Sequence, residues 1–470
     1  MRRKKIQQAL HNILITGFAA EGKSIAKHEG KVIFVPGAIP GDRVDLLITR
    51  SKKDWAEARI TTLIEPAANR LIPFCKHFGT CGGCKWQMLP YADQLAYKQQ
   101  EAIQNILRIA KVEPKEILPI LGSEETTAYR NKLEFTFSNK RYLSFEEVKS
   151  AALIIQENAL GYHAPGVFDK VIDIEECFLM DEVNNLIRNS IRDFALQHQL
   201  SFYDIKEHSG WLRNIIIRKC STGNLLVNLC LHYEDESNRV ALLDFLLEKV
   251  PSITTLLYTI NPKWNDSIYD LEPVVYFGPG YVIEKLGSLS FKIGPKSFFQ
   301  TNSHQGKRLY DVVKDFAGLN GWETVYDLYC GTGSIGLYLH DVAKKIIGVE
   351  TVAEAIEDAK ENAGMNHISN AQFFAGDVIK ICNADFFAEQ GKPDLVITDP
   401  PRAGMHEKLV TTLMEIEPPR IVYVSCNTAT QARDIGILSE KYDLLKLRPV
   451  DMFPHTHHIE CVALLQLKKT

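Results

Sequence analysis

The sequence has no apolar run long enough to span a bilayer, which argues against an integral membrane protein with a spanning helix. Its basic start, MRRKKIQQAL, is followed by neither the apolar core nor the small-residue cleavage site of a signal peptide. The ten cysteines are scattered irregularly, unlike the framework of a small secreted disulfide protein. We therefore expect a cytoplasmic protein whose clustered cysteines act as ligands or nucleophiles.

A strong positive charge is also missing. The net charge is −4, so the chain as a whole lacks the signature of a nucleic-acid-binding protein. The charge is unevenly distributed, because residues 1–60 hold twelve Lys and Arg against six Asp and Glu. A basic module on an acidic body can steer a polyanion, although an ordinary solvated face would have the same composition.

With 470 residues and 45% hydrophobic content, the chain is long enough for two to four domains, and we predict three. Residues 1–64 hold short strands separated by Pro and Gly turns, typical of a small β-barrel of the oligonucleotide-binding (OB) type. A hairpin domain without a partner would give a similar pattern. Residues 65–295 mix strands and helices, which indicates an α+β domain. Residues 296–470 alternate helices with apolar strands, which predicts a Rossmann-like α/β domain with a doubly wound parallel sheet.

The strands of this last domain are predicted from short apolar runs. The parallel strands are expected at Thr324–Leu328, Lys345–Val349, Ala371–Phe374, Asp394–Thr398 and Arg420–Val424. Two further runs, near Asp443–Leu447 and Cys461–Leu467, follow each other closely. We expect them to form an antiparallel edge of the sheet.

A glycine-rich loop leaves the first of these strands and opens a helix. Gly331, Gly333 and Gly336 match the G-x-G-x-x-G dinucleotide fingerprint. Glu350 ends the next strand, close to where an acidic residue would bind ribose hydroxyls. An NAD-dependent dehydrogenase is therefore one interpretation, although several nucleoside cofactors use such a turn.

Acidic residues at successive strand ends favour S-adenosylmethionine over NAD. Asp327 lies within the strand end, where its carboxylate can face the cofactor's ammonium group. Asp377 is placed to meet the adenine edge, and Asp399 ends the fourth strand beside the reacting centre. A row of carboxylates suits a cationic sulfonium better than a pyrophosphate, so we predict a methyltransferase.

Cys426 follows an apolar strand, at the exit where open α/β sheets place their chemistry. A thiolate that adds to C6 of uracil makes C5 nucleophilic enough to take up a methyl group. A general base must then remove the C5 proton before the thiol can leave. We predict Cys426 as the nucleophile and Glu460 as the base, although a lone Cys or Glu is more often a packing or surface residue.

Four segments together resemble the RNA uracil-C5 methyltransferase family, class I S-adenosylmethionine-dependent enzymes that form 5-methyluridine in 23S rRNA or tRNA. These segments are Asp327–Gly336, Asp399–Gly404, Ser425–Asn427 and His458–Glu460. The resemblance implies that Cys426 is the nucleophile and Glu460 the base. It also implies a cofactor site made by Gln300, Asp327, Tyr329, Gly331, Gly333, Ser334, Glu350, Asp377 and Asp399.

Two positions depart from the family pattern. Thr428 stands where the family commonly has Pro, and Ser334 stands where Asn is frequent. Because the thiol of Cys426 is retained, we expect a changed loop rather than lost activity.

Cys75, Cys81 and Cys84 form a C-x5-C-G-G-C motif that needs a fourth ligand. Zinc would accept another Cys or a His such as His77, whereas a [4Fe–4S] cluster would need a fourth, distant thiolate, and the spacing alone favours neither. The resemblance to the iron–sulfur 23S rRNA branch of the family implies a [4Fe–4S] cluster with Cys177 as the fourth ligand. Cys84 and Cys177 are further apart than the resemblance to this branch implies, so we expect an insertion near residues 139–158.

The N-terminal module resembles a TRAM domain, a small RNA-binding barrel, and Tyr129–Lys132 resembles part of the family's RNA-facing domain. Lys85–Gln87 is expected to be exposed. We therefore predict a monomeric enzyme that methylates 23S rRNA and has no membrane partner. The same chemistry on the T-loop uridine of tRNA is the first alternative. An RNA-binding or iron–sulfur protein with a degenerate methyltransferase domain is the second, which the intact Cys426, Glu460 and Asp399 disfavour.

Overall fold

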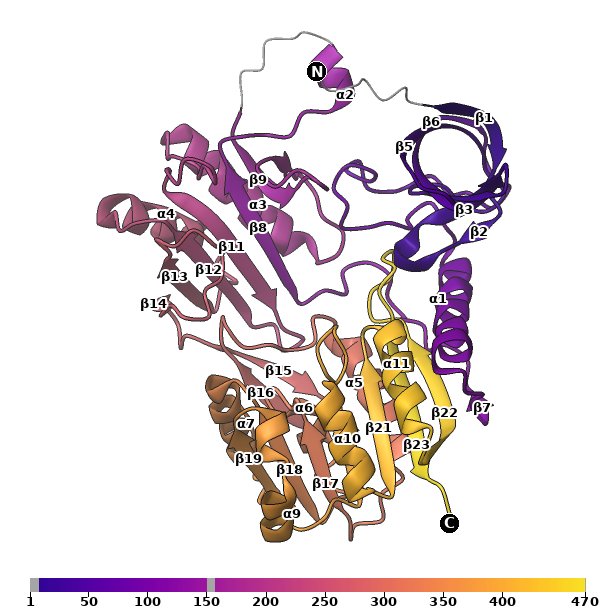
Figure 1. Ribbon diagram of the computed structural model, residues 1–470. Coiled ribbons are helices and arrows are strands. Elements are labelled where there is room, and N and C mark those ends of the chain that lie inside the picture. Colours follow the sequence, from indigo (N-terminus) through magenta and orange to yellow (C-terminus); the bar gives the residue numbers. More distant parts are fainter. Residues whose placement is uncertain (1–7, 150–156, 470) are drawn as a thin grey trace.

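The computed structural model describes residues 8–149 and 157–469, and the strands of these residues form four sheets (Figure 1). The insertion predicted near 139–158 lies partly outside the described residues, at 150–156. Just before that gap the chain forms helix α2 (Phe145–Lys149). No helix in the described part of the chain is long and apolar enough to cross a bilayer.

The first sheet is the small barrel predicted near the N-terminus. Its strands follow the order β1-β5-β6-β4-β3-β2, and Figure 1 shows them curling into a ring. Ile33, Val35, Val44 and Leu46 are buried while their neighbours along each strand are more exposed, as the two-residue period of a strand requires. The strands are β1 (Ala9–Leu14), β2 (Gly17–Phe18), β3 (Ser24–His28), β4 (Lys31–Val35), β5 (Arg43–Ser51) and β6 (Trp55–Glu65), with a 3₁₀ turn at Ala20–Gly22.

The last part of the segment after the barrel is buried, so the prediction that Lys85–Gln87 is exposed was wrong for Trp86 and Gln87. Trp86 is 1% exposed, and its indole N–H donates to the Gly22 carbonyl oxygen at 3.3 Å. Its ring packs edge-on against Phe18 of β2. An isolated tryptophan in a polar stretch gives no sign of such burial, because the contacts come from the barrel. Trp86 therefore anchors the barrel to the rest of the protein.

The second sheet belongs to the predicted α+β region and has the order β10-β9-β8-β11-β12-β13-β14. Two helices pack on one face, where Phe135, Ile215 and Leu229 meet Ile187 and Leu243 in the core. β12 and β13 are parallel, and the neighbouring pairs are antiparallel. The elements are β8 (Lys132–Ser138), β9 (Ala159–His163), β10 (Val171–Asp173), α3 (Glu182–Gln197), β11 (Leu212–Lys219), β12 (Leu225–Leu231), α4 (Glu236–Lys249), β13 (Thr255–Ile260) and β14 (Val274–Phe277).

The C-terminal sheet has the order β19-β18-β17-β20-β21-β23-β22-β7, and its first five strands are parallel, which confirms the Rossmann-like prediction. β23 runs antiparallel and lies between β21 and β22. Its elements are β7 (Glu116–Ile117), β17 (Thr324–Leu328), α6 (Ser334–Tyr338), β18 (Lys345–Glu350), α7 (Ala353–Met365), β19 (Ala371–Ala375), α8 (Val378–Ile381), α9 (Ala384–Gln390), β20 (Leu395–Thr398), α10 (Glu407–Ile416), β21 (Arg420–Ser425), α11 (Thr428–Leu438), β22 (Tyr442–Val450) and β23 (Glu460–Leu467).

Both faces of this sheet are covered, as a doubly wound fold requires. One face packs against α5, α7 and a two-stranded hairpin, and the other packs against α1, α10 and α11 (Figure 1). The covering elements not yet bounded are α1 (Tyr91–Asn105), which continues as a π-turn at Ile106–Ala110, the hairpin of β15 (Val282–Leu286) and β16 (Leu289–Ile293), and α5 (Ser303–Ala317).

Helix α1 makes a buried ion pair with the loop that leads into β23. Lys98 Nζ lies 2.7 Å from Asp451 Oδ1, and both side chains are fully buried. Tyr91 donates its hydroxyl to the other Asp451 oxygen at 2.9 Å, and Lys98 also donates to the Phe453 carbonyl oxygen at 3.2 Å. Burial lowers the pKa of Lys98, and Asp451 opposes that shift. These bonds fix the loop of residues 451–459 immediately before Glu460.

Replacing Lys98 with methionine should lower the free energy of unfolding by about 3–5 kcal/mol, because it leaves the Asp451 charge buried without a counter-ion. The double variant Lys98→Met/Asp451→Asn removes both charges and should recover most of that loss. Urea denaturation followed by tryptophan fluorescence measures the free energy of unfolding of both variants. An equal loss in the single and double variants would contradict the role of the ion pair.

Candidate active site

The strand ends of the C-terminal sheet bring three predicted residues to one edge. In the parallel pair β17 and β20, Leu328 lies opposite Thr398. In the antiparallel pair β21 and β23, Ser425 lies opposite Cys461. Asp399 and Cys426 follow Thr398 and Ser425 in the chain, and Glu460 precedes Cys461 in the antiparallel strand, so all three residues reach the same edge of the sheet. Burial raises the pKa of the Cys426 thiol, and the negative charges of Glu460 and Asp399 both raise it further.

The glycine loop after β17 has the backbone that a tight strand-to-helix turn needs. Tyr329, Gly331 and Gly333 have φ angles of +63°, +53° and +76°, and helix α6 begins directly afterwards. A side chain at Gly333 would also lie 2.9 Å from the ring of Phe373. The Gly331 N–H donates to Glu350 Oε2 at 3.2 Å, so Glu350 ties the loop to the end of β18. The structure thus brings these predicted cofactor residues together.

Asp327 leaves one buried carboxylate oxygen without a partner. Its Oδ2 accepts the Gly336 N–H at 2.8 Å, whereas its Oδ1 has no hydrogen-bond partner among the described residues. Burial raises the pKa of Asp327 to about 7, and Asp399 and Glu350 add to the shift. A buried oxygen of this kind suits a cationic hydrogen-bond donor, because an unpaired buried carboxylate is costly.

The other predicted cofactor residues already have partners. Ser334 Oγ lies 2.8 Å from the hydroxyl of buried Tyr310. Asp377 caps helix α8 by accepting a backbone N–H at 3.0 Å. Gln300 is buried, and its carbonyl oxygen accepts from the Asn131 side chain at 2.9 Å. These hydrogen bonds hold Ser334, Asp377 and the backbone of Gln300 in place around the site.

Cys426 and Glu460 lie in an acidic setting. Burial, Glu460 and Asp399 together raise the pKa of the Cys426 thiol to about 11, against the opposing charge of Arg402. Burial raises the pKa of Asp399 to about 7. Burial and then Asp399 raise the pKa of Glu460 well above its usual range. In the ligand-free protein the thiol therefore keeps its proton at pH 7, and a bound cation would favour the reactive thiolate.

Arg402 and His458 are two further site residues for which the sequence indicated no role. Arg402 Nη2 lies 3.5 Å from His458 Nδ1, and the Arg402 carbonyl oxygen accepts from the Asn427 side chain at 3.0 Å. Burial lowers the pKa of His458 to about 3, so the ring is neutral at pH 7. Both lie inside the motifs that carry Asp399 and Glu460, which is the signal that could have found them. Arg402 supplies positive charge beside the thiol.

Thr428, the departure from the family pattern, is the first residue of helix α11. Proline would fit this position because its missing N–H has no partner inside the helix. Thr428 instead accepts a hydrogen bond from the Asn105 side chain at the end of α1, at 2.7 Å. The hydroxyl therefore ties the turn after Cys426 to α1.

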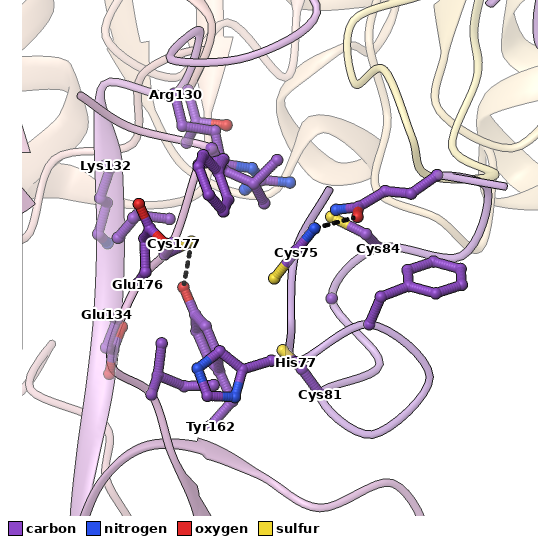
Figure 2. Close-up of a pocket in the computed structure, with 18 residues that line it drawn as sticks. Cys75, His77, Cys81, Cys84, Arg130, Lys132, Glu134, Tyr162, Glu176 and Cys177 are labelled. Atoms are coloured by element: carbon purple, nitrogen blue, oxygen red, sulfur yellow. Dashed lines mark hydrogen bonds between the residues drawn. The ribbon is translucent and has the colours of Figure 1, made fainter. Parts of the chain in front are cut away.

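A separate cavity of about 320 Å³ is lined by all four predicted cluster ligands (Figure 2). Cys75, Cys81 and Cys84 reach it from the loop after the barrel, and Cys177 reaches it from the segment before α3. Burial raises the pKa of Cys81 to about 11 and that of Cys84 to about 12. Within residues 8–149 and 157–469, no three His, Cys, Asp or Glu side chains are grouped so as to hold a metal ion. The structure brings the four thiols to one cavity without forming a metal site.

Two known protein families match this chain, one at each end. A family profile described as tRNA (Uracil-5-)-methyltransferase matches residues 281–468, and a TRAM domain profile matches residues 11–61. An uncharacterized RNA methyltransferase of Bacteroides thetaiotaomicron is 52% identical over 453 residues, which cover 96% of this chain and 100% of that protein. Another, from Porphyromonas gingivalis, is 48% identical over 96% of this chain and 98% of its own length.

A solved structure extends the likeness to the whole fold. The tRNA (uracil-54, C5)-methyltransferase of Pyrococcus abyssi, in complex with S-adenosyl-L-homocysteine, is 25% identical with a TM-score of 0.73, covering 98% of this chain and 100% of that one. This likeness sets the dehydrogenase interpretation aside. The chain therefore belongs to the family of S-adenosylmethionine-dependent RNA uracil-5-methyltransferases that carry an N-terminal TRAM domain.

Proposed function

We propose that this protein methylates C5 of a uridine in RNA through a covalent bond between Cys426 Sγ and C6 of the base. The observation that carries the proposal is the strand register. Ser425 at the end of β21 pairs with Cys461 of β23, so the neighbouring residues Cys426 and Glu460 lie at the same sheet edge, where the charge of Asp399 reaches both. A nucleophile and a proton acceptor then share the sheet edge with the glycine-rich loop.

The side chains at this edge supply the bonds and protons of the reaction. The Cys426 thiol loses its proton to solvent, a step that a bound cationic cofactor would favour, and the thiolate adds to C6 of uracil. Negative charge then moves onto C5 and O4, where the Arg402 cation can stabilise it. S-adenosylmethionine, when bound, would supply the methyl group that C5 takes up and would leave as S-adenosyl-L-homocysteine. Glu460 then accepts the C5 proton, the C6–S bond breaks, and the C5=C6 double bond of the ring is restored.

The residues of the glycine loop fit this cofactor. The unpartnered Asp327 Oδ1 would accept the cofactor's ammonium group, and Glu350 would accept ribose hydroxyls. Asp377 would meet the adenine edge. We propose that the site is completed by Gln300, Tyr329, Gly331, Gly333, Ser334 and Asp399.

The affinity for S-adenosylmethionine should rise with pH. Asp327 and Asp399 titrate near pH 7 without ligand, and a bound cation favours their ionised forms. Binding near pH 6 should therefore release protons, and the dissociation constant should fall by about tenfold from pH 6 to pH 8 for each such carboxylate. Calorimetry in buffers of different ionisation enthalpy measures the proton release and the affinity together.

Asp327→Asn is the matched variant for this titration. It should bind S-adenosylmethionine more weakly and lose part of the pH dependence, because one titrating carboxylate is gone. A dissociation constant of the natural protein that does not change between pH 6 and pH 8 would contradict the assignment.

We propose 23S rRNA as the substrate, with tRNA as the second candidate. The cavity lined by Cys75, Cys81, Cys84 and Cys177 supports 23S rRNA as the substrate. The reason is that the branch of the family that this chain resembles combines an iron–sulfur cluster with methylation of 23S rRNA. The name of the Pyrococcus abyssi enzyme, which assigns it uracil 54 of tRNA, favours the second candidate. The experiment is to map 5-methyluridine in rRNA and tRNA from a strain that lacks the gene. Loss from 23S rRNA alone supports the first, loss from tRNA alone supports the second, and loss from neither contradicts the proposed product.

We propose further that the four thiols hold a [4Fe–4S] cluster rather than zinc. Four thiolates are the ligand set of such a cluster. His77, the alternative zinc ligand, already accepts a backbone N–H at Nε2, at 3.2 Å. Because the proposed reaction transfers no electrons, the cluster would act in folding or in positioning.

Protein purified without oxygen should contain about four irons per chain. The Cys177→Ser variant should lose iron, whereas Cys230→Ser should keep it, because Cys230 is buried in the central sheet away from the cavity. Stoichiometric zinc without iron would contradict the cluster.

A further inference from the structure

A short segment of the central domain, residues 128–132, contacts both loops that lead to the proposed active-site residues. We call it the strap. Its backbone is bonded to the segment after Cys177: the Ala128 N–H donates to the Phe178 carbonyl oxygen and the Arg130 N–H to that of Leu179, each at 2.7 Å. Ala128 has a φ of +54°, a region that residues with a side chain rarely adopt. The strap is thus held in one conformation beside the thiol cavity.

Asn131 bonds the strap to the loop that carries Gln300. Its side-chain Nδ2 donates to the Gln300 carbonyl oxygen at 2.9 Å and to Ser303 Oγ at 2.6 Å. Its backbone N–H donates to the Thr301 carbonyl oxygen at 2.7 Å. Asn131 is only 6% exposed, so water does not replace these bonds readily. The backbone of the proposed cofactor residue is therefore fixed by a residue of the central domain.

Tyr129 and Arg130 bond the strap to the loop of residues 451–459. The Tyr129 hydroxyl donates to the Pro454 carbonyl oxygen at 2.9 Å, and the Tyr129 side chain is buried. The Arg130 guanidinium lies over the ring of Phe453, 4.9 Å from its centre. Arg130 also lines the thiol cavity (Figure 2). The strap therefore contacts the loop that ends at Glu460.

The two loops also contact each other. Asn302 is buried and donates its Nδ2 to the Met452 carbonyl oxygen at 3.0 Å. The Lys85 and Trp86 N–H groups, which follow Cys84, donate to the His455 carbonyl oxygen at 2.8 and 3.0 Å. Both segments that supply cysteines to the cavity are therefore linked to the loop of residues 451–459. The segment that follows Cys84 is hydrogen-bonded to it directly, and the segment that follows Cys177 is linked to it through the strap.

We propose that Asn131 and Tyr129 are positioning residues with separate tasks. Asn131 sets the Gln300 backbone for binding of S-adenosylmethionine, and Tyr129 sets the 451–459 loop so that Glu460 can remove the C5 proton. The inference rests on the proposed function, because it takes the roles of Gln300 and Glu460 from it. Neither residue touches the reacting atoms, so each acts through the loop to which it is bonded.

Two variants, one for each loop, separate the tasks. Asn131→Ala removes both side-chain bonds to the Gln300 loop and should raise the dissociation constant for S-adenosylmethionine roughly tenfold. Its rate of adduct breakdown should stay within about twofold. Tyr129→Phe removes one bond to the 451–459 loop and should slow breakdown of the covalent RNA adduct by roughly five- to tenfold. Its affinity for S-adenosylmethionine should stay within about twofold.

Calorimetry gives the affinity for S-adenosylmethionine, and quenched single-turnover reactions resolved on denaturing gels give the rate of adduct breakdown. Two matched controls come from the same central domain. Tyr203→Phe removes a hydroxyl that lies 2.7 Å from His208 Nδ1, and Asn214→Ala removes a bond to Thr136 Oγ1 at 3.3 Å. Both controls should leave the two readouts unchanged. Ser303→Ala removes one of the Asn131 bonds and serves as a second variant for the cofactor readout.

The proposal is overturned if each strap variant changes both readouts equally, if neither readout changes, or if the controls change them as much. A purely structural role would give one of these results. Failure of the proposed function is distinguishable through Glu460→Gln. If Glu460→Gln accumulates no adduct on ordinary RNA, the base assignment fails. If it does accumulate adduct and Tyr129→Phe behaves like the natural protein, only the strap fails.

Discussion

Cys426→Ala is expected to abolish both methyl transfer and the covalent RNA adduct, a loss on the order of 10⁴-fold or more in turnover, as for other catalytic nucleophiles. The reason is chemical, since without the thiolate at C6 the C5 carbon is too electron-poor to take up a methyl group. RNA containing 5-fluorouridine provides the measurement. Fluorine at C5 cannot leave as a proton does, so the natural protein should form an adduct that survives denaturing electrophoresis.

Cys230→Ala is the matched control for this experiment. Cys230 is equally a free thiol, but it is buried in the central sheet. This variant should form the adduct at the natural rate, which separates loss of the nucleophile from loss of a buried thiol. An adduct that persists in Cys426→Ala would show that another residue attacks the base.

Glu460→Gln is expected to lower turnover by about 10²- to 10⁴-fold, the range typical for removal of a general base. The glutamine keeps the shape of the side chain but cannot accept the C5 proton. Methyl transfer precedes that step, so the variant should accumulate a methylated adduct on ordinary uridine RNA. Gel electrophoresis after a single turnover would show the band, and digestion followed by mass spectrometry would show the methyl group in it.

Glu460→Asp provides a graded comparison, because it keeps a carboxylate but shortens its reach. It should release product more slowly than the natural protein and faster than Glu460→Gln. If Glu460→Gln turns over at the natural rate and gives no adduct on the gel, Glu460 is not the base and another group, such as His458, must accept the C5 proton.

The sequence predicted the parts of the active site that depend on local pattern. The alternation of apolar strands and helices predicted the parallel sheet, and Gly331, Gly333 and Gly336 predicted the tight strand-to-helix turn after β17. The antiparallel pairing of the last two strands was also predicted. Local pattern was sufficient here because strand exits and glycine turns depend on residues close together in the chain.

The meeting of Cys426 with Glu460 could not be derived from local pattern. It depends on β23 inserting between β21 and β22, an order that contacts distant in sequence decide. The burial of Trp86 was missed for the same reason, since the barrel covers it. Asn131 is a polar residue whose partners lie about 170 residues away, and no pattern near it indicates those partners.

The fate of the hydrogen on C5 tests the central claim most directly. RNA carrying deuterium at C5 of uridine is incubated with the protein and S-adenosylmethionine, then digested to nucleosides for mass spectrometry. Covalent catalysis by Cys426 and Glu460 predicts 5-methyluridine that has lost the C5 deuterium, one for each methyl group gained, and no product with Cys426→Ala. A methylated uridine that keeps its C5 deuterium would place the methyl group on another atom and contradict the mechanism.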